Sequence, residues 1–525
     1  MCIRDRLHAV ASLDEATLQH GLRQLVEAEL VYQRDAGPQA TYLFKHALIQ
    51  DAAYQSLLRS TRQQYHQRIA QVVEAQFPET AETQPELLAH HYTEAGRHAQ
   101  AIPYWQQAGQ RAVRRSAYRE AAACYEQALE ALQQLPGGHE VPVEAIDLRL
   151  HLRNVLLPLG EQERILDHLR VAATLAEAVQ DQPRLGWVTI YMTSCYYNLG
   201  QPENAVETGQ RALTMARALG DVALHIQAAY YLGLAYHLLG HYRQAVDLLE
   251  STVAALEGSL VHERFGLPYL PSVFSRTWLV WCLAELGAFD EGRAIGQDSL
   301  RIAEASERPW DLLAALRGVG LRALGQGDIQ VALPVFERCL DLCQTWEIVG
   351  WFAIIAAQLG YTYALAGRMR DALPLLERAL GQGSARPSVY HARLLSYLSE
   401  VYLLDGRPED ALPHAVSALE LAHARKERGF QAYALRLVGD IAAQHEPCNV
   451  AQAAADYHRA LALAEELGMR PLQAHCHHGL GTLFVTTGQR EQARLELSTA
   501  LNLYRAMEMT FWLPEAEAAL SQVEG

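Results

Sequence analysis

The chain has 525 residues, of which 50% are hydrophobic and 20% charged, and its formal net charge is −16. Half apolar content excludes a disordered chain, and such an acidic surplus gives no overall attraction to nucleic-acid phosphates or anionic membranes. The longest apolar runs, at residues 278–284 and 351–357, are far shorter than the about 20 residues that a membrane-spanning helix needs. The eight cysteines are scattered, and the first residues lack the apolar stretch of a signal peptide. We therefore expect a cytoplasmic protein that binds neither nucleic acid nor membrane.

The first 80 residues differ in pattern from the rest of the chain. Residues 1–6 fit none of the pattern around them, and we expect them to be a non-native leader. The elements expected next are a helix over 18–28, strands at 30–32 and 41–44, and one long helix over about 46–77. Asp35, Gly37 and Pro38 suit the turn of a β-hairpin between the two strands. The order helix, hairpin, helix predicts a partial winged-helix domain over residues 7–80.

A repeat sets the architecture of the remaining chain. Glycine recurs with a residue five positions later, usually small, that opens an amphipathic run. The pairs are Gly96/Ala101, Gly160/Ile165, Gly200/Ala205, Gly240/Ala245, Gly287/Gly292, Gly327/Ala332, Gly367/Ala372, Gly406/Ala411 and Gly488/Ala493, with a variant at Ala453. Most second members lie 39 to 42 residues apart. A gap of 64 holds an additional helix over about 118–135, and a gap of 47 holds an insertion with Pro268 and Pro271.

Leu-Gly-x-x-aromatic motifs stand before several of these glycines, as in Leu232-Gly233…Tyr236, Leu359-Gly360…Tyr363 and Leu480-Gly481…Phe484. Small residues let two antiparallel helices approach closely, while Tyr and Leu fill the gap to the next hairpin. These packing positions resemble those of tetratricopeptide repeats over residues 85–511, with helices longer than in the usual repeat. We predict an all-α fold, a right-handed tetratricopeptide-like α-solenoid of about ten helical hairpins with a period near 40. It would span residues 81–511, follow the winged-helix segment with its short β-hairpin, and end in a capping helix at 512–525.

A superhelix of this kind has a concave surface lined by the first helix of each hairpin. Counting from the Leu-Gly register gives the residues that we expect to face this groove. They are Trp187, Tyr197, Asn198, Tyr230, His237, Trp281, Arg317, Tyr361, Arg393, His475 and His478. Some of them would contact a ligand, and the remainder would be solvated or would pack along the array.

The N-terminal part carries a more specific resemblance. Residues 42–58 (YLFKHALIQDAAYQSLL) resemble the winged helix of bacterial signal-transduction ATPases of the STAND/AAA type. Residues 84–92 (QPELLAHHY) and 101–112 (AIPYWQQAGQRA) resemble the join to the repeats in the same family. These proteins commonly run from an adenylate/guanylate cyclase domain through the ATPase and winged helix to tetratricopeptide repeats. The resemblance implies that His46 is a nucleotide sensor, but only in an intact parent; the alternative is a histidine that caps the junction of strand and helix.

The chain departs from this family in one respect. No Gly-x-x-x-x-Gly-Lys-[Ser/Thr] loop occurs, so the phosphate cradle of the ATPase is absent, and no catalytic motif stands out. We expect an N-terminally truncated, non-catalytic sensing arm without a cofactor, whose protein or peptide partner, or small-molecule effector, binds in the groove. The alternatives are a stand-alone adaptor that binds peptides and the sensor region of a large ATP-dependent transcriptional regulator, for which a C-terminal helix-turn-helix would be the mark.

Two clusters have simpler interpretations. His475, Cys476, His477 and His478 are the densest group of metal-ligand residue types, but a structural zinc site needs four converging ligands and no second helical pair is nearby. The pair Cys339 and Cys343 lies three repeats away, so we expect no metal site. The arginines at 111, 114, 115 and 119 suit a solvated helix end that complements the helix dipole.

Overall fold

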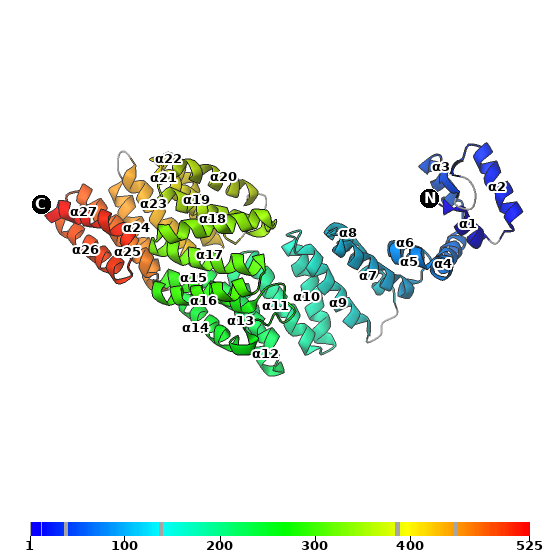
Figure 1. The fold of residues 1–525 in the computed structure, drawn as a ribbon, viewed down its shortest axis with the longest axis horizontal. Helices are drawn as coiled ribbons and strands as arrows, with labels where there is room; N and C mark the ends of the chain where they lie inside the picture. Colours follow the sequence, from blue (N-terminus) through cyan, green and yellow to red (C-terminus); the bar gives the residue numbers. More distant parts are fainter. Residues whose placement is uncertain are drawn as a thin grey trace. The chain divides into compact units, whose positions relative to one another are not determined.

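The computed structural model describes residues 2–11, 13–35, 40–135, 140–383, 389–445 and 449–524. The chain divides into two compact units, Met1–Val188 and Thr189–Gly525, here called the N-terminal unit and the C-terminal unit. Both are built almost entirely of helices (Figure 1). Within the described ranges, no helix is both long enough and apolar enough to cross a membrane.

The N-terminal unit begins with a small antiparallel sheet in the order β1-β3-β2. Its strands are β1 (Cys2–Ile3), β2 (Val31–Arg34) and β3 (Thr41–Phe44). In the hairpin, Val31 pairs with Phe44 and Arg34 with Thr41. The predicted β-hairpin is therefore confirmed, while the predicted turn residues Gly37 and Pro38 lie outside the described residues. Strand β1 was not predicted.

The long helix expected over residues 46–77 is wrong as a single element. The structure has two helices there, α3 (Ala47–Gln55) and α4 (Arg59–Gln76). Ser56 donates its hydroxyl to the carbonyl of Ala53, and Leu58 takes an extended backbone with φ −60° and ψ 146°. A helix cannot continue through an extended residue, so α4 starts anew after Leu58.

The other helices of the N-terminal unit follow in chain order. They are α1 (Arg4–Ala11), α2 (Glu15–Glu27), α5 (Pro78–Thr83), α6 (Pro85–Glu94), α7 (His98–Arg114), α8 (Tyr118–Gln133), α9 (Glu140–Leu156) and α10 (Gln162–Ala178). Helix α8 is the additional helix expected in the long gap, and it packs on both α7 and α9. Gly109 of α7 makes room for Tyr125 of α8, since a Cβ there would lie 2.8 Å from the tyrosine ring.

Helix α11 (Gln182–Asn198) leads into the C-terminal unit, which is a series of antiparallel helical hairpins (Figure 1). Its further helices are α12 (Pro202–Leu219), α13 (Val222–Leu238), α14 (Tyr242–Ala255), α15 (Pro271–Leu286), α16 (Phe289–Ala305), α17 (Pro309–Gln326), α18 (Ile329–Thr345), α19 (Val349–Leu365), α20 (Met369–Gly383), α21 (His391–Leu404), α22 (Pro408–Ala424), α23 (Arg428–Gln444), α24 (Val450–Leu467), α25 (Arg470–Thr486), α26 (Arg490–Ala506) and α27 (Leu513–Glu524). Short 3₁₀ turns, η1 (Gly258–Leu260) and η2 (Thr510–Trp512), precede α15 and α27.

The repeated glycines end the first helix of each hairpin, as the period predicts. All nine, from Gly96 to Gly488, have φ between 67° and 81°, a left-handed conformation that favours glycine. The residue five positions later is buried in every hairpin. Gly481 shows why small residues are needed inside the hairpins, since a Cβ there would lie 2.6 Å from Leu497. The all-α repeat fold is therefore confirmed.

The C-terminal unit closes on itself along a line of loop contacts, which we call the seam. The loops after α11, α13, α15 and α17 contact residues that lie about 185 to 227 positions later in the sequence. The contacting pairs are Gly200 with Arg425, Gly240 with Leu467, Gly287 with Met507, and Gly327 with Trp512. Gln326 also donates its side-chain amide to the carbonyl of Met507 at 3.3 Å. The hairpins therefore touch partners far along the chain as well as their immediate neighbours.

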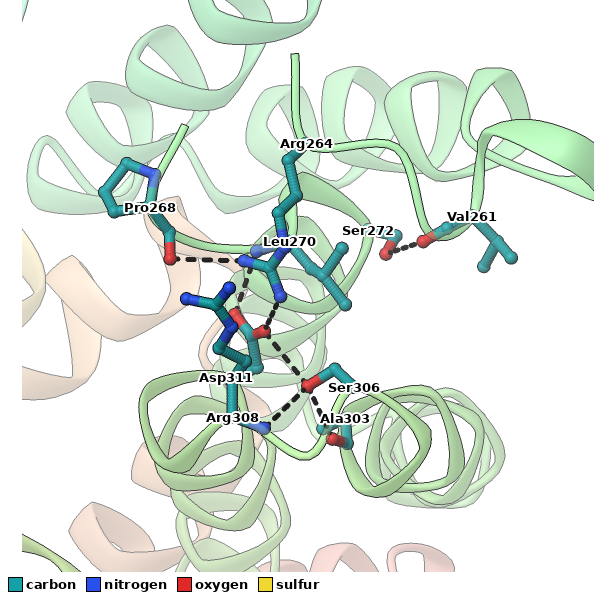
Figure 2. A network of polar contacts seen from close by, with 9 residues as sticks. All are labelled: Val261, Arg264, Pro268, Leu270, Ser272, Ala303, Ser306, Arg308 and Asp311. Atoms are coloured by element: carbon teal, nitrogen blue, oxygen red, sulfur yellow. Dashed lines mark hydrogen bonds and ion pairs between the residues drawn. The ribbon is translucent and has the colours of Figure 1, made fainter. Parts of the chain in front are cut away.

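The insertion before α15 is held by one buried carboxylate (Figure 2). Asp311 of α17 is 0% exposed. It accepts hydrogen bonds from the guanidinium of Arg264 at 2.7 Å and from the backbone N–H of Leu270 at 2.8 Å. Ser306 donates its hydroxyl to the same carboxylate at 3.1 Å. The insertion is thus fastened to the start of α17.

Candidate functional site

A cavity of about 610 Å³ lies inside the C-terminal unit. Its walls come from the first helices of successive hairpins, α15, α17, α19, α21, α23 and α25, together with η2 and α27. We call it the interior cavity. Its size is in the range of pockets for small molecules or short peptide segments.

One wall of the interior cavity carries a charged network. Arg436 of α23 donates to Glu400 of α21 at 2.8 Å and to Asp440, one turn along α23, at 2.5 Å. Tyr361 donates its hydroxyl to Glu400 at 2.9 Å, and Tyr457 donates to Asp440 at 2.6 Å. Burial raises the pKa of Asp440, and Arg436 opposes that rise. The charge of Arg436 is therefore paired with the two carboxylates of this network.

Glu285 of α15 forms a second polar group in the same cavity. It accepts hydrogen bonds from the indole N–H of Trp281 at 3.0 Å and from the hydroxyl of Tyr433 at 2.8 Å. Burial raises the pKa of the Glu285 carboxyl above its ordinary range, while nearby Arg393 opposes the rise. The bond to Tyr433 joins helices α15 and α23 across the interior.

Arg393 of α21 differs from Arg436 in making no hydrogen bond with the residues that the structure describes, although the charges of Glu285 and Glu400 attract it. Its guanidinium carbon lies 4.3 Å from the ring centre of Tyr397 and 3.9 Å from that of Tyr433. Such cation–π contacts stabilise a guanidinium that is removed from water. Among the residues that the structure describes, none forms a hydrogen bond or a close ion pair with Arg393. Its N–H donors are therefore available in the cavity.

Another part of the lining comes from α25, η2 and α27. His475 shares a hydrogen bond of 2.8 Å with the hydroxyl of Tyr504, and its ring meets that of Trp512 edge-on at 4.6 Å. The Nε2 atom of His478 is buried, without a hydrogen-bond partner among the described residues. Burial lowers the pKa of both histidines, so both are neutral at pH 7. Apolar side chains, among them Leu321, Leu324 and Leu403, complete the lining.

Residues 188–258 match the family model of the tetratricopeptide repeat. The chain contains a tetratricopeptide region. No curated protein matches the chain in sequence.

Among solved structures, a Rap protein complexed with Competence and Sporulation Factor is similar, with a TM-score of 0.50 and 13% identity, covering 70% of this chain and 98% of that one. Aspartyl phosphate phosphatase F from Bacillus subtilis has a TM-score of 0.46 and 15% identity, covering 72% and 90% of the two chains. The APC/C hetero-tetramer Cut9-Hcn1 has a TM-score of 0.45 and 14% identity, covering 91% and 96%. At these identities the likeness to the Rap protein concerns the fold alone.

The interior cavity brings together five of the eleven residues expected in the groove of the tetratricopeptide region. They are Trp281, Tyr361, Arg393, His475 and His478. The other six are not among its lining residues. Trp187 and Asn198 are half-buried on α11, and Asn198 donates its amide to the carbonyl of Ser194.

The remaining four, Tyr197, Tyr230, His237 and Arg317, are each less than 8% exposed and belong to an aromatic layer behind the cavity. Arg317 lies 4.7 Å from the ring of Trp281 and 5.4 Å from that of Tyr390. The ring of His237 packs against the same tryptophan, with 4.3 Å between the ring centres of His237 and Trp281. These four side chains do not line the cavity, and neighbouring rings cover them.

His46 lies apart from these residues, in the N-terminal unit. It is exposed, stands at the N-cap of α3 with φ −137° and ψ 139°, and makes no side-chain capping bond. Its role as a nucleotide sensor remains a prediction about an intact parent.

The charged partners in the cavity were not predicted, although the repeat period marks their positions. Tyr361, Glu400 and Asp440 are separated by 39 and 40 positions, the same spacing as the repeat glycines. They occupy one register on successive first helices and meet through Arg436 and Tyr457. The count from the Leu-Gly motif selected aromatic and basic residues at this register but passed over the carboxylates.

The histidine and cysteine clusters have separate partners. His477 pairs with Glu496 at 2.5 Å, and Cys476 is fully buried. Burial raises the pKa of the Cys343 thiol to about 11, so it is protonated at neutral pH. In the described ranges, no group of three or more His, Cys, Asp or Glu side chains is placed to hold a metal ion.

Proposed function

We propose that this chain is the non-catalytic, ligand-sensing and protein-interaction arm of a cytoplasmic signal-transduction ATPase of the type associated with adenylate/guanylate cyclases. The observation that carries the proposal is the interior cavity of about 610 Å³, in which the N–H donors of Arg393 form no hydrogen bond with the residues that the structure describes. A cavity of this size, with polar donors among apolar walls, is typical of a binding site. A binding site for a protein, a peptide or an effector gives Arg393 a role.

The ATPase context rests on the N-terminal resemblance. We assign residues 1–6 to a non-native leader, 7–80 to a partial winged helix, 81–511 to the repeats and 512–525 to a capping helix. Two exposed leucines support contact with a further domain: Leu48 on α3 is 80% exposed and Leu58 before α4 is 75% exposed. Contact with a further domain would remove these side chains from water. In the intact parent, His46 would lie beside them, near the nucleotide.

Binding can switch an ATPase only if the ligand prefers one of two conformations of the arm. The seam offers such a pair of states, since the interior cavity is lined by helices from both sides of it. A ligand that holds α15 and α25 together favours the closed seam, and its loss favours an open one. The Rap protein that is similar in fold is described in complex with Competence and Sporulation Factor, which supports a protein or peptide partner for this chain too.

The first experiment is to sequence the native DNA upstream of the codon for Leu7. We expect the reading frame to continue into a Gly-Lys-Thr or Gly-Lys-Ser phosphate loop. ATP hydrolysis by that parent should then change when Arg393 is replaced by Gln and should stay unchanged with a surface control, Arg378→Gln. A stop codon with a ribosome-binding site before Leu7 would contradict the ATPase context and leave a stand-alone peptide-binding adaptor.

A further inference from the structure

We propose that the interior cavity binds a ligand through a carboxylate group, and that Arg393 is the residue that holds it. This inference deepens the proposed function, on which it rests, by naming the chemistry of the ligand. It depends on three features of the cavity: the aromatic contacts of Arg393, the carboxylates near it, and the apolar part of the lining.

The aromatic contacts of Arg393 leave its N–H donors for a ligand. Its guanidinium carbon lies over the rings of Tyr397 and Tyr433, 4.3 and 3.9 Å from their centres. The five N–H donors of a guanidinium lie in its plane and point outward from its edge. A planar acceptor with two oxygens can meet two of these donors at once, which is the bidentate geometry of arginine with a carboxylate.

The surrounding charges favour a single negative charge on the ligand. Arg436 forms ion pairs with Glu400 and Asp440, at 2.8 and 2.5 Å. Glu285 lies near Arg393 and accepts hydrogen bonds from two neutral donors. The carboxylates of Glu285 and Glu400, whose charges attract Arg393, would repel a dianion such as phosphate more strongly than a monoanion.

The apolar lining indicates the rest of the ligand. Leu321, Leu324, Leu403 and Trp512 line the same cavity of about 610 Å³. Burial of apolar surface contributes affinity there, while the carboxylate fixes the orientation. The ligand is therefore an apolar or aromatic body with one carboxylate, which either a small organic acid or the C-terminus of a short peptide supplies.

The test uses the full chain and two matched pairs of probes. The first pair is 3-phenylpropionate and its amide, 3-phenylpropionamide. The second is a pool of N-acetylated random hexapeptides without Asp or Glu, made once with a free C-terminal carboxylate and once as the C-terminal amide. Binding is measured by isothermal titration calorimetry and by the shift in the midpoint of thermal unfolding.

We expect at least one acid to bind the wild-type chain and its amide to bind about 10- to 100-fold more weakly, the usual loss when a charge-assisted hydrogen bond is removed. Arg393→Gln should weaken the acid to the level of the amide, and Arg393→Lys should retain part of the binding. Arg378→Gln is the matched control, because Arg378 also stacks on a ring, that of Phe352 at 4.5 Å, but is exposed and outside the cavity lining. This control should bind like the wild type.

Binding of 3-phenylpropionate alone identifies a small organic acid as the source of the carboxylate, and binding of the free-carboxylate peptides alone identifies a peptide C-terminus. Equal binding of acid and amide to the wild-type chain would overturn the carboxylate assignment while leaving the interior cavity as a binding site. The absence of binding by all four probes would overturn the inference as well. If Arg393→Gln fails to fold, the comparison of acid with amide on the wild-type chain decides. The DNA upstream of Leu7 tests the ATPase context separately, so the two proposals can fail independently.

Discussion

Glu427, the N-cap residue of α23, is a carboxyl group that is 0% exposed and has no hydrogen-bond partner for either oxygen among the described residues. Its nearest cation, a nitrogen of Arg425, is 3.9 Å away. Burial raises the pKa of Glu427 to about 8. The folded chain therefore holds a proton on Glu427 at neutral pH that the unfolded chain releases.

Glu427→Gln should stabilise the chain increasingly as pH rises. A carboxyl whose pKa is raised in the folded state does not lower the free energy of unfolding at pH values below its unfolded pKa of about 4.5. Above that value the loss of free energy grows with pH until the pH reaches about 8. The difference at pH 7 is roughly 3 kcal/mol, because one pKa unit corresponds to about 1.4 kcal/mol. Urea unfolding of both chains at pH 5, 6, 7 and 8 measures it. A difference that does not change with pH would contradict this account.

Gly367 allows a test of the repeated turn. It has φ 75°, and a Cβ there would meet nothing within 4 Å, so Gly367→Ala changes backbone strain without a clash. We expect a loss of about 1 kcal/mol in the free energy of unfolding. Gly350→Ala in α19 is the matched control, because its surroundings are also open but its φ is ordinary. That control should be neutral or stabilising by up to about 1 kcal/mol.

At the scale of elements, the insertion before α15 depends on Asp311. Asp311→Ala should lower the free energy of unfolding by roughly 3 kcal/mol, because it leaves the Leu270 N–H and the Arg264 guanidinium without their acceptor. Asp290→Ala is the control, because the Asp290 carboxylate is 82% exposed and its ion pair with Arg293 is long, at 3.7 Å. This control should change the free energy of unfolding by less than about 0.5 kcal/mol. Urea unfolding compares the two variants. Equal losses would show that the network in Figure 2 is dispensable.

The packing of α4 on α6 should respond to acid. His66 and His91 share a hydrogen bond of 2.8 Å between their Nδ1 atoms, so one of them must accept. Burial lowers the pKa of His91 to about 4, from an ordinary value of 6.5. A lowered pKa of a base gives stability that is complete above the unfolded pKa and is lost as pH falls from about 6.5 to 4.

We expect His91→Gln to reduce this acid sensitivity of the N-terminal unit, which amounts to at most roughly 3 kcal/mol in the wild type. Thermal unfolding at pH 7.5 and pH 5, followed by circular dichroism, measures it. The exposed residue His46 provides a control, and His46→Gln should leave the shift between the two pH values as it is in the wild type. An unchanged shift in His91→Gln would refute the role of this pair.

The period of the sequence was enough to predict the helical hairpins, because one small residue and one glycine per repeat determine how two helices pack and turn. The break between α3 and α4 could not be predicted, since it depends on the extended backbone of Leu58 and no proline or glycine marks it. In the candidate site, the register predicted residues such as Tyr361 and Arg393 that line the cavity. It could not distinguish them from His237 and Arg317, because the rings that cover these two residues come from other hairpins, which the period does not place.

At the scale of the whole molecule, the contacts between neighbouring hairpins and the contacts of the seam need different lengths of chain. Contacts between neighbouring hairpins could form in an array of any length. The seam forms only when all the hairpins from α11 to α26 are present, because it joins Gly200 to Arg425 and Gly287 to Met507. The cavity with Arg393 is complete only in that closed state, since its walls include α15 and η2.

The seam also determines how the C-terminal unit unfolds. An open solenoid frays from its ends, and each repeat exchanges its amide protons at its own rate. Here the amides of α13 and α15 should become protected to the same degree as those of α24 and α26, although these helices lie some 200 positions apart, because neither group can open without parting from the other. Hydrogen exchange followed by mass spectrometry would reveal this as a single cooperative opening in place of a gradient along the chain. The repeats would then behave as one folding unit of globular character, slow to form because its contacts are so distant in sequence.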